Sequence, residues 1–413
     1  MKNLIKKIIP PFLLNFYHFS LAFLGALIYG FPSRNLIVIG ITGTSGKTTT
    51  AELTIKILEE YLKEKKSNQK VALASSIKFK IGENEEENKL KMTMPGRFTL
   101  QKFLKKAVKN NCKYAVLEVT SEGIKQYRHK FIKFDVALLT NLSPEHIESH
   151  KGFENYKKAK GKLFEETKNI HIINIDDKNA DYFLKFPARK KYTFGLNQGD
   201  INNKDLNLNL LIPGDFNIYN ALAAICIAFS QNIDIEFSKK VVENFKGIPG
   251  RMEVVIEKPF KVVVDYAITP VSLEKVYKTL ISDFKNKDSK LICVLGSCGG
   301  GRDKWKRPVL GEIAYKYCDN IIITNEDPYD EDPLKIIDDV AKGAKEKAQK
   351  ILDRKEAIKT AIKLAKENDT IIITGKGCEP LMCLANGKKI PWDDRKIVKE
   401  EFKKNQKQLN GKI

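Results

Sequence analysis

A glycine-rich run, GITGTSGKTTT at positions 40–50, has the residue types of a phosphate site. An apolar segment precedes it and a helical segment follows, a context in which backbone N–H groups of the loop and of the helix N-terminus hold phosphate oxygens. Five residues separate Gly40 from Gly46, one more than the strict GxxxxGK[ST] pattern allows. Lys47 is expected to neutralise phosphate charge, and Thr48 to ligate a metal ion. We predict a nucleotide site at Gly43, Thr44, Ser45, Gly46, Lys47, Thr48 and Thr49.

Further segments combine carboxylates, cations and histidines with the ends of expected strands and helices. They are TMPGRFTLQ (93–101), LEVTSEGIKQYR (117–128), NLSPEHIESHKGFENYKKAKGKLF (141–164), GDFNIYN (214–220), IPGRMEVV (248–255), VDYAITP (264–270), SCGGGRDKWKRP (297–308) and TGKGCEP (374–380). Together with the glycine-rich loop, they resemble the ATP-dependent Mur ligase family, which also includes folylpolyglutamate and cyanophycin synthetases. The resemblance extends from about residue 36 to about residue 400 and is greatest to the UDP-N-acetylmuramoyl-tripeptide synthetase type.

This resemblance implies ATP and Mg²⁺ as cofactors and gives Lys47, His146 and Lys160 catalytic roles. Glu118 ends an expected strand, from which its carboxylate can reach a metal beside the loop. The resemblance therefore places the metal on Thr48, Glu118, His146 and Lys160. Lys160 matches a lysine that is carbamylated in the family. A carbamate suits this position because an ammonium group would repel Mg²⁺.

The same resemblance assigns the acceptor and the nucleotide. It places the acceptor at Thr93, Ser121 and Arg128. Met94 stands where the family has a second threonine, so one polar contact to the acceptor is lost or replaced. The nucleotide side is expected at Asn217, Asn220, Arg251 and Asp265, with Lys306 and Arg307 nearby. An asparagine at a helix N-terminus is also a common cap, so Asn220 keeps that alternative.

The amino-acid pocket departs from the family pattern. Arg302 is expected to hold the α-carboxylate, because a planar guanidinium fork suits that group. Enzymes of the family that use diaminopimelate carry DNPR, whereas this chain has EDPY at 326–329. Tyr329 replaces the arginine that would bind the distal carboxylate. Asp327 and Glu379 are expected to face the amino acid, so we predict that diaminopimelate is not preferred and that lysine, ornithine or a smaller amino acid competes.

Apolar runs that alternate with helical stretches predict an α/β fold, with a P-loop central domain built on a parallel sheet and a C-terminal Rossmann-like α/β domain. The strands are expected at 36–40, 114–119, 134–141, 171–176, 261–267, 291–296, 320–325 and 370–375. We expect an apolar helical segment at 1–35, the central domain at 36–248 and the C-terminal domain at 249–413. ENEEEN (83–88) is expected to be an exposed acidic loop, and the tail after 395 a Lys-rich helix.

The composition limits the class of protein. With 42% hydrophobic and 30% charged residues among 413, the chain is expected to fold and not to be disordered. The formal charge of +21 favours acidic partners such as nucleotide phosphates or anionic lipid. We expect no nucleic-acid partner and a monomer. Seven scattered cysteines without a CxxC pair argue against a disulfide framework or structural zinc, and for a reducing cytoplasm.

The apolar segment at 8–33 has the length of a membrane span, but Pro10, Pro11, Asn15, His18 and Ser20 interrupt it. It has no clear signal-peptide cleavage site. Three arrangements stay open: an interfacial helix on anionic lipid, a helix packed on the next domain of the protein, and a spanning helix. An interfacial helix would place the enzyme at the inner face of the cytoplasmic membrane.

Members of the tripeptide-synthetase type carry about a hundred residues before the loop that bind the UDP part of the acceptor, whereas 39 residues precede Gly40 here. The acceptor is therefore expected to be a UDP-sugar held differently or a lipid-linked peptide. The resemblance implies an ATP-dependent ligase that joins an amino acid to a carboxylate of a cell-wall peptide precursor through an acyl phosphate.

Two other functions stay open. One is a ligase of the folylpolyglutamate or poly-amino-acid synthetase type, against which EVTSEG, RDKWKRP and GKGCE count. The other is a non-catalytic nucleotide-binding partner, suggested by Ile268 and Cys378, which stand where the family has histidines.

Overall fold

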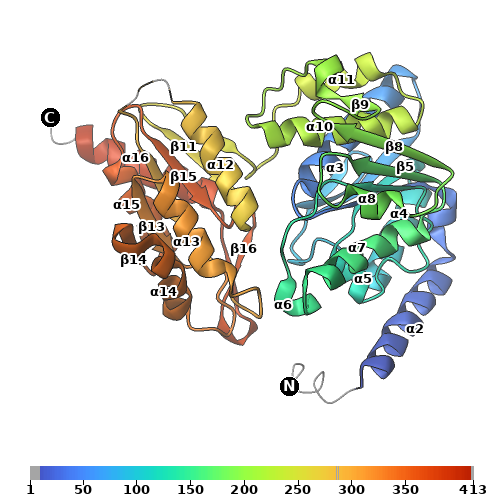
Figure 1. Ribbon diagram of the computed structural model, residues 1–413, viewed down its shortest axis with the longest axis horizontal. Helices are drawn as coiled ribbons and strands as arrows, with labels where there is room; N and C mark the ends of the chain where they lie inside the picture. The colour runs from blue at the N-terminus through green and yellow to red at the C-terminus, as the bar shows by residue number, and fades with distance from the viewer. Residues whose placement is uncertain (1–9, 285, 287, 411–413) are drawn as a thin grey trace. The chain divides into compact units, whose positions relative to one another are not determined.

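The computed structural model describes residues 10–284, 286 and 288–410, which fall into two compact units (Figure 1). Within these residues, the N-terminal unit contains the chain up to Pro144, then Gly152–Leu211 and Phe216–Phe245. The C-terminal unit contains Glu145–Lys151, Ile212–Asp215 and the chain from Lys246 onward. The short stretch Glu145–Lys151 thus belongs by its contacts to the C-terminal unit, although the chain on both sides of it belongs to the N-terminal one.

The N-terminal unit is built on one sheet with the strand order β4-β3-β2-β5-β1-β6-β7-β8-β9. From β2 to β9 every neighbouring pair is parallel, and β3 and β4 add an antiparallel edge. The strands are β1 (Ile37–Thr42), β2 (Lys70–Ala74), β3 (Lys78–Ile81), β4 (Asn84–Glu87), β5 (Cys112–Glu118), β6 (Val136–Leu139), β7 (Ile170–Asn174), β8 (Lys190–Gly195) and β9 (Ile201–Asn202).

Alternate residues of these strands enter two separate cores, as expected for a sheet covered on both faces. Ile39 and Ile41 of β1 pack with helices α3 and α10, whereas Val38 packs with α4 and α7. The helices and the short helical turn of this unit are α2 (Pro11–Tyr29), η1 (Pro32–Asn35), α3 (Lys47–Glu64), α4 (Arg97–Lys109), α5 (Ser121–Lys125), α7 (Phe153–Glu166), α8 (Ala180–Leu184), α9 (Asn203–Leu206), α10 (Asp215–Ser230) and α11 (Ile235–Glu243).

The C-terminal unit has a second sheet with the order β10-β11-β15-β12-β13-β14, parallel except for β10. Its strands are β10 (Glu253–Ile256), β11 (Lys261–Asp265), β12 (Leu291–Leu295), β13 (Asn320–Thr324), β14 (Ala348–Ile351), β15 (Thr370–Thr374) and a small hairpin, β16 (Leu381–Cys383) with β17 (Lys389–Pro391). Its helical elements are α6 (Ile147–His150), α12 (Pro270–Ser282), α13 (Lys306–Tyr317), α14 (Pro333–Ala344), η2 (Lys345–Lys347), α15 (Arg354–Leu364), η3 (Ala385–Gly387) and α16 (Asp394–Asn410). Helices α15 and α16 pack on one face of this sheet (Figure 1).

The predicted α/β fold with parallel sheets is confirmed, and each predicted apolar run overlaps a strand of one of the two sheets. Segment 83–88 was predicted to be an exposed acidic loop, and this prediction of its backbone conformation was wrong. Its residues Asn84–Glu87 form β4, an exposed edge strand paired with β3. Lys78 and Lys80 of β3 both bind Glu85 across this pair, at 3.2 and 2.9 Å. These cross-strand ion pairs are a reason for strand formation that a run of polar residues does not reveal.

The apolar segment near the N-terminus forms α2, and residues 1–9 lie outside the described part of the chain. By length and composition α2 is able to cross a membrane. One side of it packs on α4, where Ala22 and Ala26 are buried and the backbone approaches Arg97 through Gly25. Most of the remaining large side chains of the helix are apolar and exposed.

One expectation about cysteine is corrected. Cys293 in β12 and Cys318 at the end of α13 form a disulfide in the core of the C-terminal unit. They are 25 residues apart, but β12 pairs with β13 in a register that places Cys293 opposite Ile321. The chain therefore returns from α13 to the position of Cys293. The sequence spacing alone gave no sign of this approach.

Candidate active site

The glycine-rich loop joins β1 to α3, as predicted. Gly43 has φ of 147°, and a Cβ there would lie 1.9 Å from Thr140 Oγ1, so a side chain does not fit. Two residues that follow β6 hold the loop in place. Asn141 Oδ1 accepts from the Ser45 N–H at 3.0 Å, and Thr140 Oγ1 donates to the Ser45 carbonyl at 2.7 Å. Lys47 Nζ donates to the Gly43 and Thr44 carbonyls, both at 2.9 Å. The loop is thus fixed before any phosphate contact.

The first turn of α3 lies against α10. Asn220 Oδ1 is 3.4 Å from Thr50 Oγ1, which donates to it, and an added Cβ at Gly46 would lie 2.3 Å from the same oxygen. Asn220 Nδ2 donates to Asn217 Oδ1 at 3.1 Å, and both asparagines are buried. Because Asn220 lies in the second turn of α10, it is not the cap of that helix. The structure brings the two asparagines to the loop, while Thr48 and Thr49 are buried at the start of α3.

Lys160 projects from α7 to the same loop. Its amine donates to the Gly43 carbonyl at 2.8 Å and to Thr42 Oγ1 at 3.4 Å, and its side chain is only 2% exposed. The amine also lies over the Tyr156 ring, 4.9 Å from the centroid. A buried lysine amine beside a phosphate loop is unusual, because burying an ammonium group is costly unless it is paired. Lys160 is therefore not a solvent-exposed surface lysine.

Glu118 ends β5, directly beside β1, where it pairs in register with Ile41. Its Oε1 accepts from the Ser76 N–H at 2.8 Å, and its Oε2 accepts from the Ser76 hydroxyl at 3.1 Å. The Ser76 hydroxyl is also 2.9 Å from Thr93 Oγ1. Parallel strands end at one edge of the sheet, so the metal candidate Glu118 and the acceptor candidate Thr93 are joined there through Ser76.

The other acceptor candidates lie near this chain of hydrogen bonds. Ser121 is buried at the first position of α5. The Arg128 guanidinium donates to the Met94 carbonyl and, at 2.8 Å, to Gln126 Oε1. The Met94 side chain is buried in the core beside Gly123, which explains why an apolar residue follows Thr93.

His146, the remaining metal candidate, lies in the stretch that belongs to the C-terminal unit, and it has a left-handed backbone with φ of 57°. Asp303 fixes this stretch by accepting from the N–H groups of Ile147 and Glu148, at 3.1 and 3.0 Å. Lys306 donates to Glu145 Oε1 at 2.9 Å, and both side chains are buried. The structure thus gives Lys306 an ion pair, where the sequence suggested the nucleotide.

Two nucleotide candidates of the C-terminal unit have defined partners. Asp265 accepts from the Met252 N–H at 2.8 Å and from the Ala267 N–H at 2.7 Å, so it anchors the backbone after Arg251. Burial raises the pKa of Asp265 above its usual value. The Arg251 guanidinium stacks over the Tyr266 ring at 4.1 Å. Arg251 thus takes its orientation from the residue that follows Asp265.

The amino-acid candidates surround a buried lysine that sequence reasoning left without a role. Lys376 Nζ donates to Asp327 Oδ1, to Glu379 Oε2 and to the Leu381 carbonyl, each at 2.8 Å. Burial alone would lower the pKa of Lys376, but the Glu379 and Asp327 carboxylates raise it above the usual value. Lys376 therefore stays charged and sets the position of both carboxylates.

Glu326 is the carboxylate of this cluster for which the described residues supply no hydrogen-bond donor, although it is only 5% exposed. Burial raises its pKa, and the charge of Asp327 raises it further. The Tyr329 backbone is left-handed, with φ of 52°, and its ring lies against Gly300. Tyr266 and Tyr329 both interact electrostatically with Arg302. This cluster, the predicted amino-acid pocket, thus contains an excess of carboxylates and a phenol where the family pattern has an arginine.

A second buried cation, Arg354, holds the two loops of this pocket. It binds both oxygens of Asp394, at 2.9 and 2.7 Å, and donates to the carbonyls of Asn325 and Thr374, at 3.3 and 2.8 Å. Those carbonyls directly precede Glu326 and the GKG turn. Arg354 therefore fixes the backbone on both sides of the acidic cluster.

Arg307, which the sequence placed near the nucleotide, binds Glu331 and Asp339 at 2.9 and 3.3 Å within its own unit.

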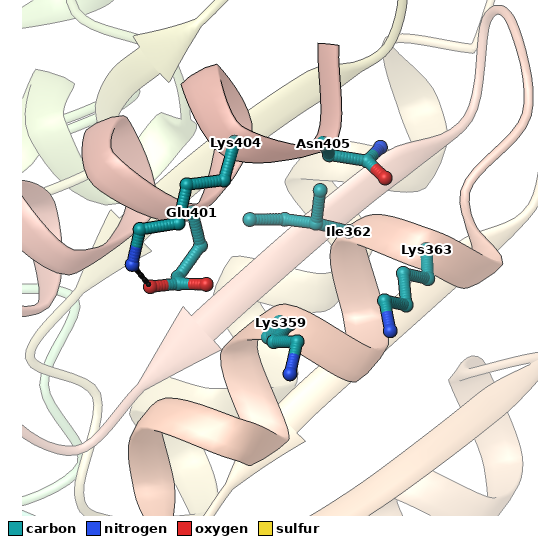
Figure 2. Close-up of a pocket in the computed structure, with 6 residues that line it drawn as sticks. All are labelled: Lys359, Ile362, Lys363, Glu401, Lys404 and Asn405. Carbon is teal, nitrogen blue, oxygen red and sulfur yellow. Dashed lines mark hydrogen bonds and ion pairs between the residues drawn. The ribbon is translucent and has the colours of Figure 1, made fainter. Parts of the chain in front are cut away.

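Figure 2 shows a separate groove between α15 and α16, of about 190 Å³. It is lined by Lys359, Ile362, Lys363, Glu401, Lys404 and Asn405. It contains none of the predicted site residues, so it plays no part in the functional assignment.

Sequence reasoning missed Ser76, Lys376 and Arg354. Ser76 has a positional signal, since it closely follows a parallel strand, at the sheet edge where ligands bind. Lys376 lies inside the TGKGCEP segment, of which the prediction named only Glu379. Arg354 has no local signal, because its partners are 20 to 40 residues away in the sequence.

Comparison with known proteins agrees with this arrangement. Residues 41–228 match the Mur ligase middle domain, and residues 250–377 match the Mur ligase, glutamate ligase domain. The chain is 38% identical to UDP-N-acetylmuramoyl-L-alanyl-D-glutamate–2,6-diaminopimelate ligase 1 of Clostridium acetobutylicum, over 93% of this chain and 82% of the relative. It is 37% identical to the corresponding ligase of Bacillus cereus, over 92% and 81%.

A solved structure of such a diaminopimelate ligase superposes with a TM-score of 0.58 at 30% identity, covering 90% of this chain and 79% of the other. Folylpolyglutamate synthase of Mycobacterium tuberculosis gives a TM-score of 0.67 at 15% identity, over 86% and 92%, and shows a shared fold alone. The chain therefore belongs to the Mur ligase family and is an ATP-dependent enzyme that forms an amide bond between an amino acid and a cell-wall peptide precursor.

Proposed function

We propose that this chain adds an amino acid to the peptide of a UDP-N-acetylmuramoyl-linked or lipid-linked acceptor, using the residues described above. The observation that supports this most strongly is the continuity of the site in the N-terminal unit. The loop, Lys160 and Glu118 lie at the carboxyl ends of β1 and β5, and Ser76 connects Glu118 to Thr93. The residues predicted to bind nucleotide, metal and acceptor in this unit thus lie at one sheet edge.

The reaction has two steps. An acceptor carboxylate oxygen attacks the γ-phosphorus of ATP, which gives an acyl phosphate and ADP. The amine of the amino acid then attacks the acyl carbon, loses a proton, and phosphate leaves. In this proposal Lys47 and the loop N–H groups stabilise charge on the phosphates, as is usual in phosphoryl transfer, and Thr93, Ser121 and Arg128 orient the acceptor.

Mg²⁺ fits the donors that this edge supplies. Carboxylate and hydroxyl oxygens are hard ligands of the kind that Mg²⁺ prefers, and Glu118 and Thr48 provide them. The described residues contain no group of three or more histidine, cysteine, aspartate and glutamate side chains that would hold a metal without other help. We propose that a carbamate on Lys160 adds oxygen ligands to those of Glu118 and Thr48. His146, which belongs to the C-terminal unit, stays a predicted ligand. When bound, the ion would neutralise charge on the transferred phosphoryl group.

The amino acid is proposed to be lysine, ornithine or a smaller one in preference to diaminopimelate, although the named relatives are diaminopimelate ligases. Glu326 has a buried carboxylate to offer to a side-chain amine. Tyr329 offers a neutral hydroxyl to a distal carboxylate, where a guanidinium would offer two charged donors. Lys304, a further cation near Arg302 in the sequence, is 60% exposed and lies 3.5 Å from Glu331.

The proposed location is the cytoplasm, with peripheral contact to the inner face of the membrane through α2. Large side chains of α2 such as Phe16 and Ile28 are 69% and 66% exposed. Each would contribute about 1.5–3 kcal/mol on leaving water. Lysines at positions 2, 6 and 7 add attraction to anionic lipid. Salt-sensitive co-sedimentation with anionic vesicles tests this, and equal sedimentation of a variant that lacks residues 1–35 would disprove it.

The catalytic assignment is tested by Lys47→Ala. ATP turnover that depends on acceptor and amino acid should fall at least a hundredfold, because a charge that stabilises the phosphates is lost, about 2.7 kcal/mol or more. Lys56→Ala is the matched control, since Lys56 lies on the exposed face of the same helix and binds only Glu60. Phosphate release at saturating ATP measures the effect. Turnover of the Lys47→Ala protein at the wild-type rate would refute the assignment.

A further inference from the structure

Helix α2 packs on chain segments that adjoin the residues proposed to bind the acceptor, and its other side is exposed. We call Leu13, Phe16, Leu24, Leu27 and Ile28 the outer face, and they are 44–69% exposed. The inner side of α2 packs on the start of α4 through Ala22, Gly25 and Ala26. Figure 1 shows α2 in blue, along one side of the N-terminal unit.

The seat of α2 is made by the same chain segments that carry acceptor side chains. α4 begins at Arg97, directly after the loop of Thr93, and the Arg97 guanidinium contacts His18 of α2. Phe19 packs edge-on against Tyr127, at 6.3 Å between centroids, and against Phe131, at 5.1 Å. Tyr127 directly precedes Arg128. The helix is therefore fixed to both sides of the acceptor group, through the residues that follow Thr93 and precede Arg128.

Charge indicates which surface covers the outer face. The first acidic residue of the chain is Glu52, so neither α2 nor the sequence on either side of it carries a carboxylate. α4, on which α2 packs, contains four lysines and no acidic residue. The amine of Lys105 lies within 4 Å of the position of a Cβ at Gly30, at the end of α2. An apolar helix that has cations and no carboxylate in its own sequence and in α4 is complementary to an anionic lipid surface.

We propose that the acceptor is a lipid-anchored peptide, held in the same bilayer on which the outer face of α2 rests. This inference rests on the proposed function and adds the substrate class. An enzyme and an acceptor that are confined to one surface meet at a raised effective concentration. The advantage belongs to the anchored acceptor and requires α2, whereas a soluble acceptor of the same peptide gains nothing from the helix.

The test compares two forms of one acceptor peptide, one attached to a lipid in phosphatidylglycerol vesicles and one attached to a UDP-sugar in solution. The variant is the triple change Phe16→Gln, Leu24→Gln and Ile28→Gln in the full chain, because glutamine keeps helix propensity. The control is Leu211→Gln with Leu334→Gln, two exposed leucines far along the chain, 65% and 54% exposed. The readout is the ratio of kcat/KM for the anchored form over the soluble form.

We expect this ratio to exceed ten in the wild type and the control, and to fall at least tenfold in the triple variant. An unchanged ratio in the triple variant overturns the inference, as does a wild type that uses only the soluble form. If the wild type turns over neither form, the proposed function itself fails. A concentration-dependent dimer that the triple variant abolishes, with vesicle binding unchanged, would also overturn the inference, because the outer face would then bind a second copy.

Discussion

The surroundings of Lys160 in the structure say more about its chemistry than its residue type does. From the sequence it is one of many lysines, and only its place in a motif marks it. In the structure its amine is buried 2.8 Å from the Gly43 carbonyl, among the groups of the phosphate loop. A buried amine that borders a predicted metal position is the setting in which a change of charge by carbamylation alters the chemistry of the site.

We expect Lys160→Ala to lose activity and to regain part of it with added short carboxylic acids, because a free carboxylate can occupy the position of the carbamate. Lys158→Ala on the exposed side of α7 should behave as the wild type. Turnover measured with and without acetate gives the result. Loss of activity in Lys160→Ala that no carboxylic acid restores, with a bare amine in the wild type by mass and density, would contradict the modified-lysine assignment.

Tyr329 gives the second prediction at this scale. Two charge-assisted hydrogen bonds from an arginine would contribute roughly 1.5–3 kcal/mol each to a distal carboxylate. Tyr329→Arg should therefore shift selectivity toward meso-diaminopimelate by at least tenfold, and Tyr315→Arg, on the outer side of α13, should not. The measurement is product mass after competition at equal concentrations. A wild type that already prefers diaminopimelate would show that the phenol does not exclude it.

Of the predicted site, the loop, Glu118, Thr93 and Lys160 come together within the N-terminal unit, because their motifs end neighbouring parallel strands or pack directly on that edge. Residues that act by holding others were not predicted. Ser76 and Lys376 bind carboxylates that the motifs name, but serine and lysine are common at surfaces and carry no signal without their partners.

At the scale of elements, each predicted apolar run overlaps a strand of a parallel pair, since a strand covered on both faces needs apolar residues throughout. The parallel strands β2, β8, β9 and β14 were not predicted. The antiparallel edge strands β3 and β4 were not predicted, because their burial is slight and ion pairs stabilise them. The exposure of α2 likewise required the structure. Its composition did not distinguish a buried helix from a lipid-facing one.

Arg354 connects elements, and its replacement should affect amino-acid binding more than ATP binding. Arg354→Lys keeps the charge but loses the fork that reaches Asp394 and the carbonyls of Asn325 and Thr374. We expect the KM for the amino acid to rise at least fivefold, and the KM for ATP to rise less than twofold. Lys355→Ala, next to it but exposed, is the control. Equal increases in both KM values would indicate general destabilisation.

At the scale of the whole molecule, the two units have separate cores, so heating should give two calorimetric transitions. Glu52 belongs to the N-terminal unit, and burial raises its pKa to about 7 despite Lys78 at 3.1 Å. The unfolded chain loses this proton near pH 4.5 and the folded chain near pH 7. Between these pH values the folded chain keeps a proton that the unfolded chain has lost. The free energy of unfolding is therefore higher at low pH and falls as the pH rises through that interval, by roughly 3 kcal/mol at most.

Glu52→Gln imitates the protonated form. The free energy of unfolding of the Glu52→Gln protein, relative to that of the wild type, should increase from pH 5 to pH 8. The increase should affect only the transition of the N-terminal unit. Arg354→Met leaves Asp394 buried without its guanidinium partner. This variant should lower the free energy of unfolding of the C-terminal unit, and so affect the other transition, by about 3–5 kcal/mol. Scanning calorimetry of both variants assigns the transitions. A shift of both transitions by either variant would mean that the units do not unfold separately.

The β4 edge has a consequence for how copies of this protein behave at high concentration. An open sheet edge offers unpaired backbone groups to any other strand, and stacking of such edges leads to fibres. β4 presents Glu85, Glu86 and Glu87 there, and the opposite edge ends in β9, which has only two residues. Lys78 and Lys80 pair with Glu85, so in two copies that approached through β4 the repulsion would come from Glu86 and Glu87 of each. This repulsion opposes polymerisation where the backbone alone would invite it.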